Sequence, residues 1–492
     1  MLFNSFEYFL FFPAVVLIYF LLPFRLRNGF LLIGSYFFYM SLKWEFGFLL
    51  LFISLVNYIA GLRIEGSVLK RSRKIWLTVS LVFSLGVLGY FKYTGFFVSE
   101  TTSFLNSLGL DIRPSYLKMA LPVGISFFTF QALSYVIDIY KEKIKAERNI
   151  INLLLYVSFF PTLLAGPIER ASNLLVQLKT QHHFSSDRLL QGTKLILWGL
   201  FKKVVIADRL ATFVDQIYAS PELYGGSTLF LATIFFTFQL YCDFSGYSDI
   251  AIGSANITGI RLVQNFNLPY LASSIGEFWK RWHMSLTAWF RDYIFLPLSF
   301  ALSGWIKGER ILFIKTDMLI YIVASIITWL LTGLWHGAGY TFIIWGLLQC
   351  LFLVIYRWQT KPARKFYKRL GISQKNKLIT LAGTLLTFAA VLVSWVFFRA
   401  ENLADAGYIL TQMFTGWSRM PYLGPSAFET ILGLALIILL FVIQVLQYRG
   451  LISFYMSTSA VPRPLRWAGY AMLLVMIAMF GVTSNKFIYF QF

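Results

Sequence analysis

The chain alternates between long apolar stretches and short polar connections over its whole length. About 20 helical residues cross the hydrocarbon core of a bilayer, so apolar stretches near that length predict membrane helices. The candidate stretches lie at residues 6–22, 30–42, 46–62, 75–93, 117–140, 150–165, 189–207, 228–242, 318–335, 338–356, 378–398, 431–447 and 467–483. The pattern predicts an all-α polytopic membrane protein with about 11 transmembrane helices.

Two of these stretches, 30–42 and 150–165, are short for a full crossing. Backbone that does not span must find hydrogen-bond partners inside the protein, so we expect re-entrant or buried segments among them. The first stretch follows an N-terminus with no basic residue before Arg25, so we expect a retained membrane helix and not a cleaved signal. We see no internal repeat, which leaves a transporter of duplicated halves without support. We treat residues 1–492 as one membrane-embedded domain.

The composition suits lipid as a solvent. Of the residues, 58% are hydrophobic and 13% are charged, whereas soluble proteins carry about 25% charged residues. The chain has 27 Tyr and 14 Trp, residue types that are enriched at the headgroup level of a membrane. Two cysteines, Cys242 and Cys350, lie in apolar stretches and form no metal-knuckle pattern, so we expect neither a disulfide framework nor a bound metal.

The net charge of +21 is concentrated in the connections. This distribution indicates how the helices are oriented in the membrane and does not indicate a nucleic-acid partner. The connections after the first, third and fifth stretches fall on one side by parity; their basic residues are Arg25, Arg27, Arg63, Lys70, Arg71, Arg73, Lys74, Lys141, Lys143, Lys145 and Arg148. Placing them in the cytoplasm puts the N-terminus outside. Residues 357–377 and 449–466 are also basic without acids, and their parity puts the tail 484–492 outside. Residues 150–317 have mixed signs and receive no topology.

Four histidines are candidates for chemistry. His336 lies in T-G-L-W-H-G-A-G-Y, between two apolar stretches, and an ionisable residue at membrane depth indicates a functional site. Glycines beside it allow a helix break, so the structural alternative is a histidine that only satisfies hydrogen bonds there. His182 and His183 lie in a polar stretch that indicates a solvated loop, although adjacent histidines can bind metal adventitiously.

Residues 276–298 hold a second group of polar residues among tryptophans, including Lys280, Arg281 and His283. On a helix, Trp279 and His283 would share one face with Leu286 or Thr287. An interfacial amphipathic helix with tryptophan anchors is the structural alternative. Basic residues here would equally attract the phosphates of a nucleotide-like acyl donor.

A third group, Q-L-Y-C-D-F-S-G-Y-S-D-I-A-I-G, contains Asp243 and Asp249. Carboxylates at membrane depth need partners. These two either orient a histidine or pair with an arginine, and a purely structural pairing stays equally open.

Several long segments together resemble the membrane-bound O-acyltransferase family, and within it the bacterial alginate O-acetylase branch. The resemblance rests on S-F-F-T-F-Q-A-L-S-Y-V-I-D-I-Y at 126–140, F-F-P-T-L-L-A-G-P-I at 159–168, Y-C-D-F-S-G-Y-S-D-I-A-I-G at 241–253, N-F-N-L-P-Y at 265–270, E-F-W-K-R-W-H-M-S-L-T-A-W-F-R-D-Y at 277–293 and L-W-H-G at 334–337. It implies a ring of helices around a central funnel. The L-W-H-G histidine maps to His336 as the catalytic residue, and His283 is the second polar residue of the site.

The resemblance also implies substrates and partners. Acetyl-CoA would be the acyl donor on the cytoplasmic side of the bacterial inner membrane, with no permanently bound cofactor. An extracytoplasmic SGNH-like acetyltransferase would pass the acetyl group to the polysaccharide. We name as supporting site residues Asp243, Asp249, Lys280, Arg281 and Trp335.

The tail ends K-F-I-Y-F-Q-F and resembles the F-x-Y-F-x-F motif of acyl-exporting systems. In that motif the tyrosine is proposed as a transient acyl carrier, which maps to Tyr489. An aromatic belt at the membrane interface is the alternative.

The expected chemistry is membrane O-acyl transfer. A neutral imidazole, with an ordinary pKa near 6.5, suits the deprotonation of a hydroxyl. Acetylation of an alginate-like cell-surface or exported polysaccharide is the leading hypothesis, and peptidoglycan O-acetylation or D-alanyl transfer are alternatives on the same fold. From another class, a polysaccharide transporter or flippase without covalent chemistry, or a scaffold that recruits a soluble acetylase, remains open.

Overall fold

The computed structural model describes residues 1–113, 121–311, 313–371, 373, 376–417, 420–424, 426–454, 462–482 and 487–488. These residues are mostly helical and contain only two short strands, which confirms the all-α fold class. Helices long and apolar enough to cross a membrane number seven among them: α3 (Glu45–Gly66), α4 (Lys70–Ser107), α11 (Gly226–Thr258), α15 (Thr316–His336), α16 (Tyr340–Arg369), α17 (Lys377–Arg399) and α19 (Ala427–Tyr448). Two shorter apolar helices, α1 (Phe6–Leu21) and α5 (Ile125–Tyr140), accompany them.

Shorter elements connect and flank these helices. The remaining α-helices are α2 (Phe24–Met40), α6 (Ile150–Ser158), α7 (Phe160–Leu163), α8 (Ala171–Leu178), α9 (Ser186–Leu200), α10 (Asp208–Ala219), α12 (Ile275–Phe278), α13 (Met284–Phe290), α14 (Leu296–Trp305), α18 (Leu403–Thr415) and α20 (Arg463–Phe480). The other elements are the π-helices η1 (Phe201–Ala207) and η4 (Arg291–Phe295), the 3₁₀ turns η2 (Pro221–Leu223) and η3 (Pro269–Leu271), and a hairpin of β1 (Arg310–Ile311) and β2 (Ile314–Lys315).

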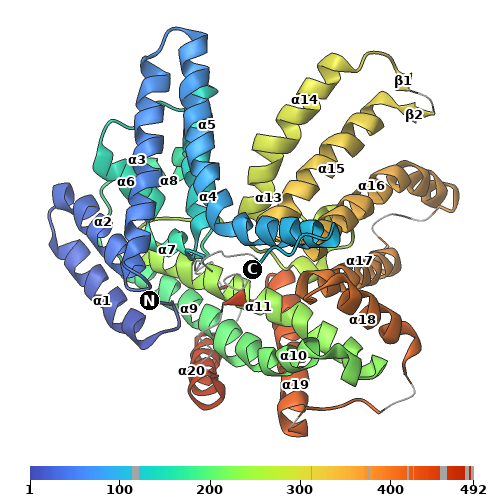
Figure 1. The fold of residues 1–492 in the computed structure, drawn as a ribbon. Helices are drawn as coiled ribbons and strands as arrows, with labels where there is room; N and C mark the ends of the chain where they lie inside the picture. The colour runs from blue at the N-terminus through green and yellow to red at the C-terminus, as the bar shows by residue number, and fades with distance from the viewer. Residues whose placement is uncertain are drawn as a thin grey trace.

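Helix α11 lies at the centre of the molecule. Its apolar window is 83% buried, whereas the windows of the other six long helices are at most 44% buried. Figure 1 shows α3, α4 and α5 standing on one side, α14 and α15 on another, and α16, α17 and α18 completing the periphery. The most buried of the seven long apolar helices is therefore the one that carries Asp243 and Asp249.

Glycines allow α9 to approach α11 closely. A Cβ on Gly199 would lie 2.6 Å from the carbonyl oxygen of Gly246, and a Cβ on Gly192 would lie 2.5 Å from that of Gly253. Small residues at such positions are a common way for membrane helices to associate. The approach brings η1, which continues α9, alongside the middle of α11.

Several predicted stretches differ in extent from the observed helices. Within the described part of stretch 117–140, which begins at residue 121, the helix begins at Ile125, after Gly124, whose φ is +77°. A side chain on Gly124 would meet the carbonyl oxygen of Leu163 at 2.3 Å, so glycine is needed at this turn. Stretch 150–165 is divided into α6 and α7 and is buried from Leu155 onward, in line with the expected buried segment.

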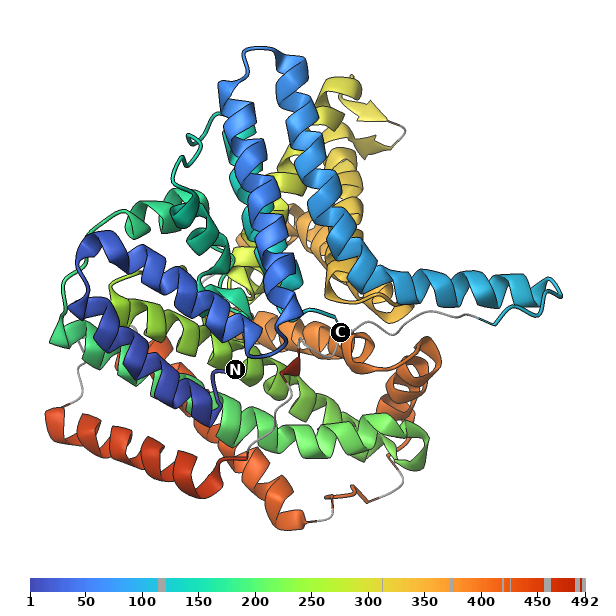
Figure 2. The ribbon, with the colours of Figure 1, turned by 60° about the vertical axis from the view of Figure 1, so that its left-hand side comes forward.

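Helix α4 is longer than its predicted stretch and changes direction. Its 38 residues continue past residue 93. Figure 2 shows the first part standing with α3 and the last part projecting sideways from the body of the molecule.

The expectation that Trp279 and His283 share a helix face with Leu286 or Thr287 is wrong. Helix α12 ends at Phe278, and His283 has a φ of +41° before α13 begins. The chain turns here because segment 265–267 binds it: the N–H of Asn267 donates to the carbonyl oxygen of Arg281. These bonds compete with helical ones, and a local periodicity argument does not contain them.

Two of the basic connections lie side by side. Arg73 forms an ion pair with Glu142, and the hydroxyl of Tyr58 donates to the carbonyl oxygen of Arg148. The end of α3 and the beginning of α4 therefore lie against the connection after α5.

Candidate active site

The two membrane histidines meet at one tryptophan ring. The ring centroid of Trp335 lies 4.8 Å from that of His336 and 5.8 Å from that of His283. Both histidines are buried, with exposed fractions of 5% and 0%. Residues that are 53 positions apart in sequence and come from different elements thus form one cluster, as the sequence analysis expected of a shared site.

His336 is held at the C-terminal end of α15. Helix α15 packs on α16 at a glycine contact, since a Cβ on Gly333 would lie 2.3 Å from the carbonyl oxygen of Phe342. The imidazole then faces two aromatic rings, with centroid distances of 5.0 Å to Trp345 and 5.1 Å to Phe398. The glycines beside His336 therefore serve the close approach of the two helices.

Helix α4 donates hydrogen bonds to the last carbonyl groups of α15. Nζ of Lys92 donates to the carbonyl oxygens of Trp335 and His336, the latter at 3.0 Å, and Oη of Tyr93 donates to that of Leu334 at 2.8 Å. The last carbonyls of a helix lack partners within the helix, and the helix dipole favours a cation there. Lys92 is thus a partly buried hydrogen-bond donor that fixes the main chain of the candidate catalytic histidine.

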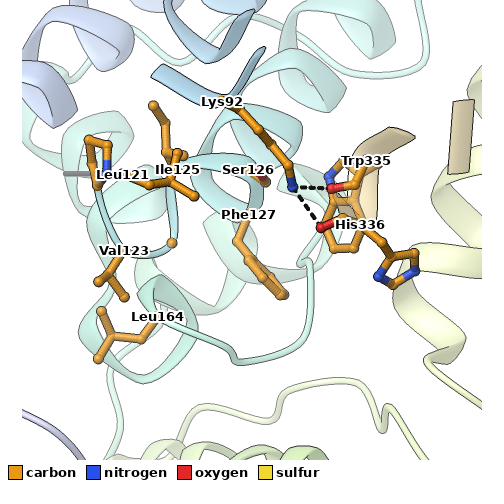
Figure 3. Close-up of a pocket in the computed structure, with 11 residues that line it drawn as sticks. Lys92, Leu121, Val123, Ile125, Ser126, Phe127, Leu164, Trp335 and His336 are labelled. Carbon is orange, nitrogen blue, oxygen red and sulfur yellow. Dashed lines mark hydrogen bonds between the residues drawn. The ribbon is translucent and has the colours of Figure 1, made fainter. Parts of the chain in front are cut away.

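A pocket opens beside this contact. Figure 3 shows Lys92, the loop before α5 and Trp335 around it, with the His336 carbonyl turned toward Lys92 and its ring directed away. The lining residues are Lys92, Leu121, Pro122, Val123, Gly124, Ile125, Ser126, Phe127, Leu164, Trp335 and His336. The main chain of His336 therefore borders a space that a small group can enter.

His283 is positioned by the segment that precedes α12. The carbonyl oxygen of Asn265 accepts from the N–H of Met284 at 2.9 Å, and its Oδ1 accepts from Oγ of Ser285 at 2.6 Å. Around the imidazole stand Phe244, edge-on with a centroid distance of 4.5 Å, and Phe127 at 6.2 Å. The left-handed backbone at His283 is thus held by hydrogen bonds from Asn265 to the two residues that follow it, Met284 and Ser285.

Asp243 and Asp249 pair with lysines, not with an arginine. Nζ of Lys203 lies 2.6 Å from Asp243 and 2.8 Å from Asp208, and Nζ of Lys202 lies 2.7 Å from Asp249. All five side chains are buried. Charges buried this deeply persist only when paired, so the pairing stabilises the contact of η1 with α11.

The end of the chain reaches the same region. The N–H of Ile488 donates to Oδ2 of Asp243 at 2.7 Å, and Phe487 packs on Tyr247 with a centroid distance of 4.3 Å. Phe487 and Ile488 are 0% and 4% exposed. Tyr489, the candidate acyl carrier, lies outside the residues that the structure describes.

Other sequence candidates lie apart from the histidine pair. Lys280 is exposed, and Arg281 pairs with Glu277 at 2.6 Å. His183 is exposed, and the His182 ring bonds the carbonyl oxygen of Gln177. Among the described residues no group of three or more His, Cys, Asp or Glu could hold a metal ion.

Sequence reasoning missed two residues of the site, Lys92 and Asn265. Lys92 is the one charged residue in stretch 75–93, which is itself a signal of a buried role. Asn265 stands in the quoted segment N-F-N-L-P-Y, but the hydrogen bond that links it to Ser285 joins positions 20 apart and has no local signature.

Two imidazoles within an aromatic enclosure suit the transfer of a proton from a bound hydroxyl to the sulfur that leaves a thioester. General acid–base catalysis of this kind contributes about 10²–10⁴-fold in rate. The aromatic walls would exclude water, the competing nucleophile.

Comparisons with known proteins agree with this chemistry. The model of the membrane-bound O-acyltransferase family matches residues 141–366, which include both histidines. The chain is 39% identical over 411 residues to the probable alginate O-acetylase AlgI of Pseudomonas aeruginosa, across 83% of this chain and 73% of that protein. It is 36% identical over 461 residues to the protein of that name from Pseudomonas putida, across 92% and 88%. It is 33% identical over 438 residues to the peptidoglycan O-acetyltransferase of Helicobacter pylori, across 82% and 78%.

Proposed function

Because this chain belongs to the membrane-bound O-acyltransferase family, and is therefore a multi-pass membrane O-acyltransferase, we propose that it exports acetyl groups for polysaccharide O-acetylation. The donor in this proposal is acetyl-CoA on the cytoplasmic side of a bacterial inner membrane. The final acceptor is an alginate-like exopolysaccharide, which the identity to the alginate O-acetylases supports. Family membership favours this enzyme over a transporter, a flippase or a scaffold.

The observation that carries the proposal is the meeting of His336 and His283 at Trp335. In the proposed step, a nitrogen of His336 accepts the proton of the acceptor hydroxyl as the oxygen attacks the thioester carbonyl. His283 stabilises the oxyanion of the tetrahedral intermediate. The carbon–sulfur bond then breaks, and the departing CoA sulfur takes the proton from His336.

The first acceptor hydroxyl in this proposal is that of Tyr489. The tail 484–492 then faces the extracytoplasmic side, where an SGNH-like acetyltransferase takes the acetyl group to the polysaccharide. The adjoining basic connections after α3 and α5 support a shared cytoplasmic side for both, which places the N-terminus outside.

Peptidoglycan O-acetylation and D-alanyl transfer are the alternatives. The relative from Helicobacter pylori, named a peptidoglycan O-acetyltransferase, supports the first. Both alternatives keep the histidine chemistry and change only the acyl group or the acceptor, so one assay can compare them.

The test is acyl transfer to the purified full-length protein from radiolabelled acetyl-CoA. Wild type, His336→Ala and Tyr489→Phe are compared, with His182→Ala as the control because His182 lies in a loop away from the histidine pair. We expect label on wild type and His182→Ala, and none on the other two. Loss of label in His336→Ala alone would show that Tyr489 is not an acyl carrier. If no sample takes label from acetyl-CoA but wild type takes label from a D-alanyl donor, the transferred group is D-alanyl and not acetyl.

A further inference from the structure

The C-terminal segment is hydrogen-bonded to η1 and to the first turn of α10, which directly follows η1 in sequence. Nη2 of Arg209 donates to the carbonyl oxygen of Phe480 at 2.7 Å, and the N–H of Val482 donates to that of Val204 at 2.9 Å. η1 is a π-helix, a rare geometry that occurs frequently at functional sites. The segment thus leaves α20 along a surface that leads toward the interior of the molecule.

The next described contact of this segment is a buried ion pair. One carboxylate oxygen of Asp243 lies 2.6 Å from Nζ of Lys203, and the other accepts the N–H of Ile488 at 2.7 Å. Lys203 belongs to η1, so the element that holds Val482 also holds the carboxylate that receives Ile488. The acceptor is a charge, which makes this hydrogen bond stronger than a neutral one.

The contact is close to the histidine pair. Phe487 packs on Tyr247 at 4.3 Å and on Phe244 at 6.1 Å, and Phe244 is edge-on to His283 at 4.5 Å. One aromatic ring therefore separates the described end of the chain from His283. Tyr489 directly follows Ile488 in sequence.

We propose that the Lys203–Asp243 pair is a dock for the C-terminal segment, in which Asp243 receives the main chain of Ile488 and seats the end of the chain beside His283. Asp243 is a positioning residue and touches no reacting atom. This inference rests on the proposed function only for what the seated segment does, and the dock itself is a structural claim.

Two features favour a dock over a simple fold anchor. The ion pair with Lys203 uses Oδ1 of Asp243, which leaves Oδ2 to accept the N–H of Ile488. The recognised group is a main-chain N–H, so the dock constrains the path of the segment and leaves its side chains available for other contacts.

Maleimide labelling of two cysteines, distinguished by mass spectrometry of their peptides, tests the dock without any acyl transfer. In full-length protein carrying Cys242→Ala, the variant Ile488→Cys reports on the tail, and the native Cys350, buried in α16, reports on general loosening. Adding Asp243→Ala should raise labelling at position 488 about tenfold or more, as expected from loss of a hydrogen bond to a charge. Labelling of Cys350 should stay unchanged.

The matched control is Asp249→Ala, which removes the neighbouring carboxylate that pairs with Lys202. It should leave labelling at position 488 within about twofold of the parent, since Asp249 is not the acceptor of Ile488. Equal labelling of all three proteins, or equal increases for both aspartate variants, would overturn the dock. Where Asp243→Ala yields no folded protein, Asp243→Leu, which keeps the approximate size and has no hydrogen-bond acceptor, takes its place.

A second pair of variants leaves the ion pair intact. Ile488→Pro removes the N–H that Asp243 accepts, whereas Ile488→Val keeps it. Acyl transfer should fall about tenfold or more in Ile488→Pro and stay near wild type in Ile488→Val. Equal transfer by both variants would overturn the role of the dock in transfer. If wild type transfers nothing while the labelling result holds, the proposed function fails and the dock stands.

Discussion

Nζ of Lys92 donates a hydrogen bond of 3.0 Å to the main-chain oxygen of His336, across 244 positions of sequence. The contact joins α4 to the end of α15 and fixes the backbone that carries the candidate catalytic imidazole. It also places the partly buried Nζ of Lys92 at the negative end of a helix dipole.

We expect Lys92→Met to lower acyl transfer about tenfold or more, because buried carbonyls that lose their donor cost about 1–3 kcal/mol each. Lys74→Met, an exposed change in a basic connection, is the control and should transfer normally. Since Lys92 acts through His336, adding Lys92→Met to His336→Ala should cause no further loss. Initial rates with labelled donor measure all four proteins, and a normal rate for Lys92→Met would show that the contact is dispensable.

Asn265 should matter through His283. Asn265→Ala removes the acceptor of the Ser285 hydroxyl, which is buried, so we expect unfolding to become easier by about 1–3 kcal/mol and transfer to fall with it. Asn106→Ala removes a side-chain bond to the N–H of Ile112 at the exposed end of α4 and should change neither. Thermal melts and transfer rates of the two variants check this, and identical behaviour would argue against a special role for Asn265.

The glycine contact of α15 with α16 predicts a packing effect. Gly333→Ala places a methyl group 2.3 Å from the carbonyl oxygen of Phe342, so the helices must separate and the stability should fall by about 1–3 kcal/mol. Gly86→Ala in α4 is the matched control, since a Cβ there meets nothing within 4 Å. Melting temperatures in detergent report the difference. A Gly333→Ala protein as stable as Gly86→Ala would contradict the close packing.

Glu169, in the connection between α7 and α8, predicts a pH dependence of stability. Burial raises the pKa of its carboxyl from 4.5 to about 7, although the N–H of Val263 and the amide of Asn173 oppose the rise. Between pH 4.5 and 7 the folded state keeps a proton that the unfolded state has lost, so stability should fall as pH rises through that window and level off above it. Melting temperatures of wild type and Glu169→Gln from pH 4.5 to 8 measure it. An equal slope in both would assign the dependence to other groups.

The sequence predicted the fold class and singled out His336 as a candidate site residue for related reasons. Membrane helices can be recognised from their composition, because lipid tolerates few charges. The same rule makes His336 conspicuous within an apolar region. The seven long helices were each recognisable as apolar stretches. Lys92 obeyed the same rule and could have been found by it.

The course of residues 275–290 could not be read from the sequence. Periodicity suggests a helix wherever polar and apolar residues recur at the right spacing, but hydrogen bonds from residues 265–267 break it around His283. Likewise, Asp243 was expected to meet a histidine or an arginine, and its partner is Lys203. In both cases the deciding contact comes from another element.

The sequence by itself determined that this protein is a multi-pass helical membrane protein with a histidine between two apolar stretches, because solubility in lipid is a property of each stretch separately. Only the tertiary structure decided that His283 joins His336 at Trp335, that Lys92 holds the end of α15, and that Ile488 reaches Asp243. These contacts arise between distant positions, and the packing of helices, which no single stretch encodes, brings them together.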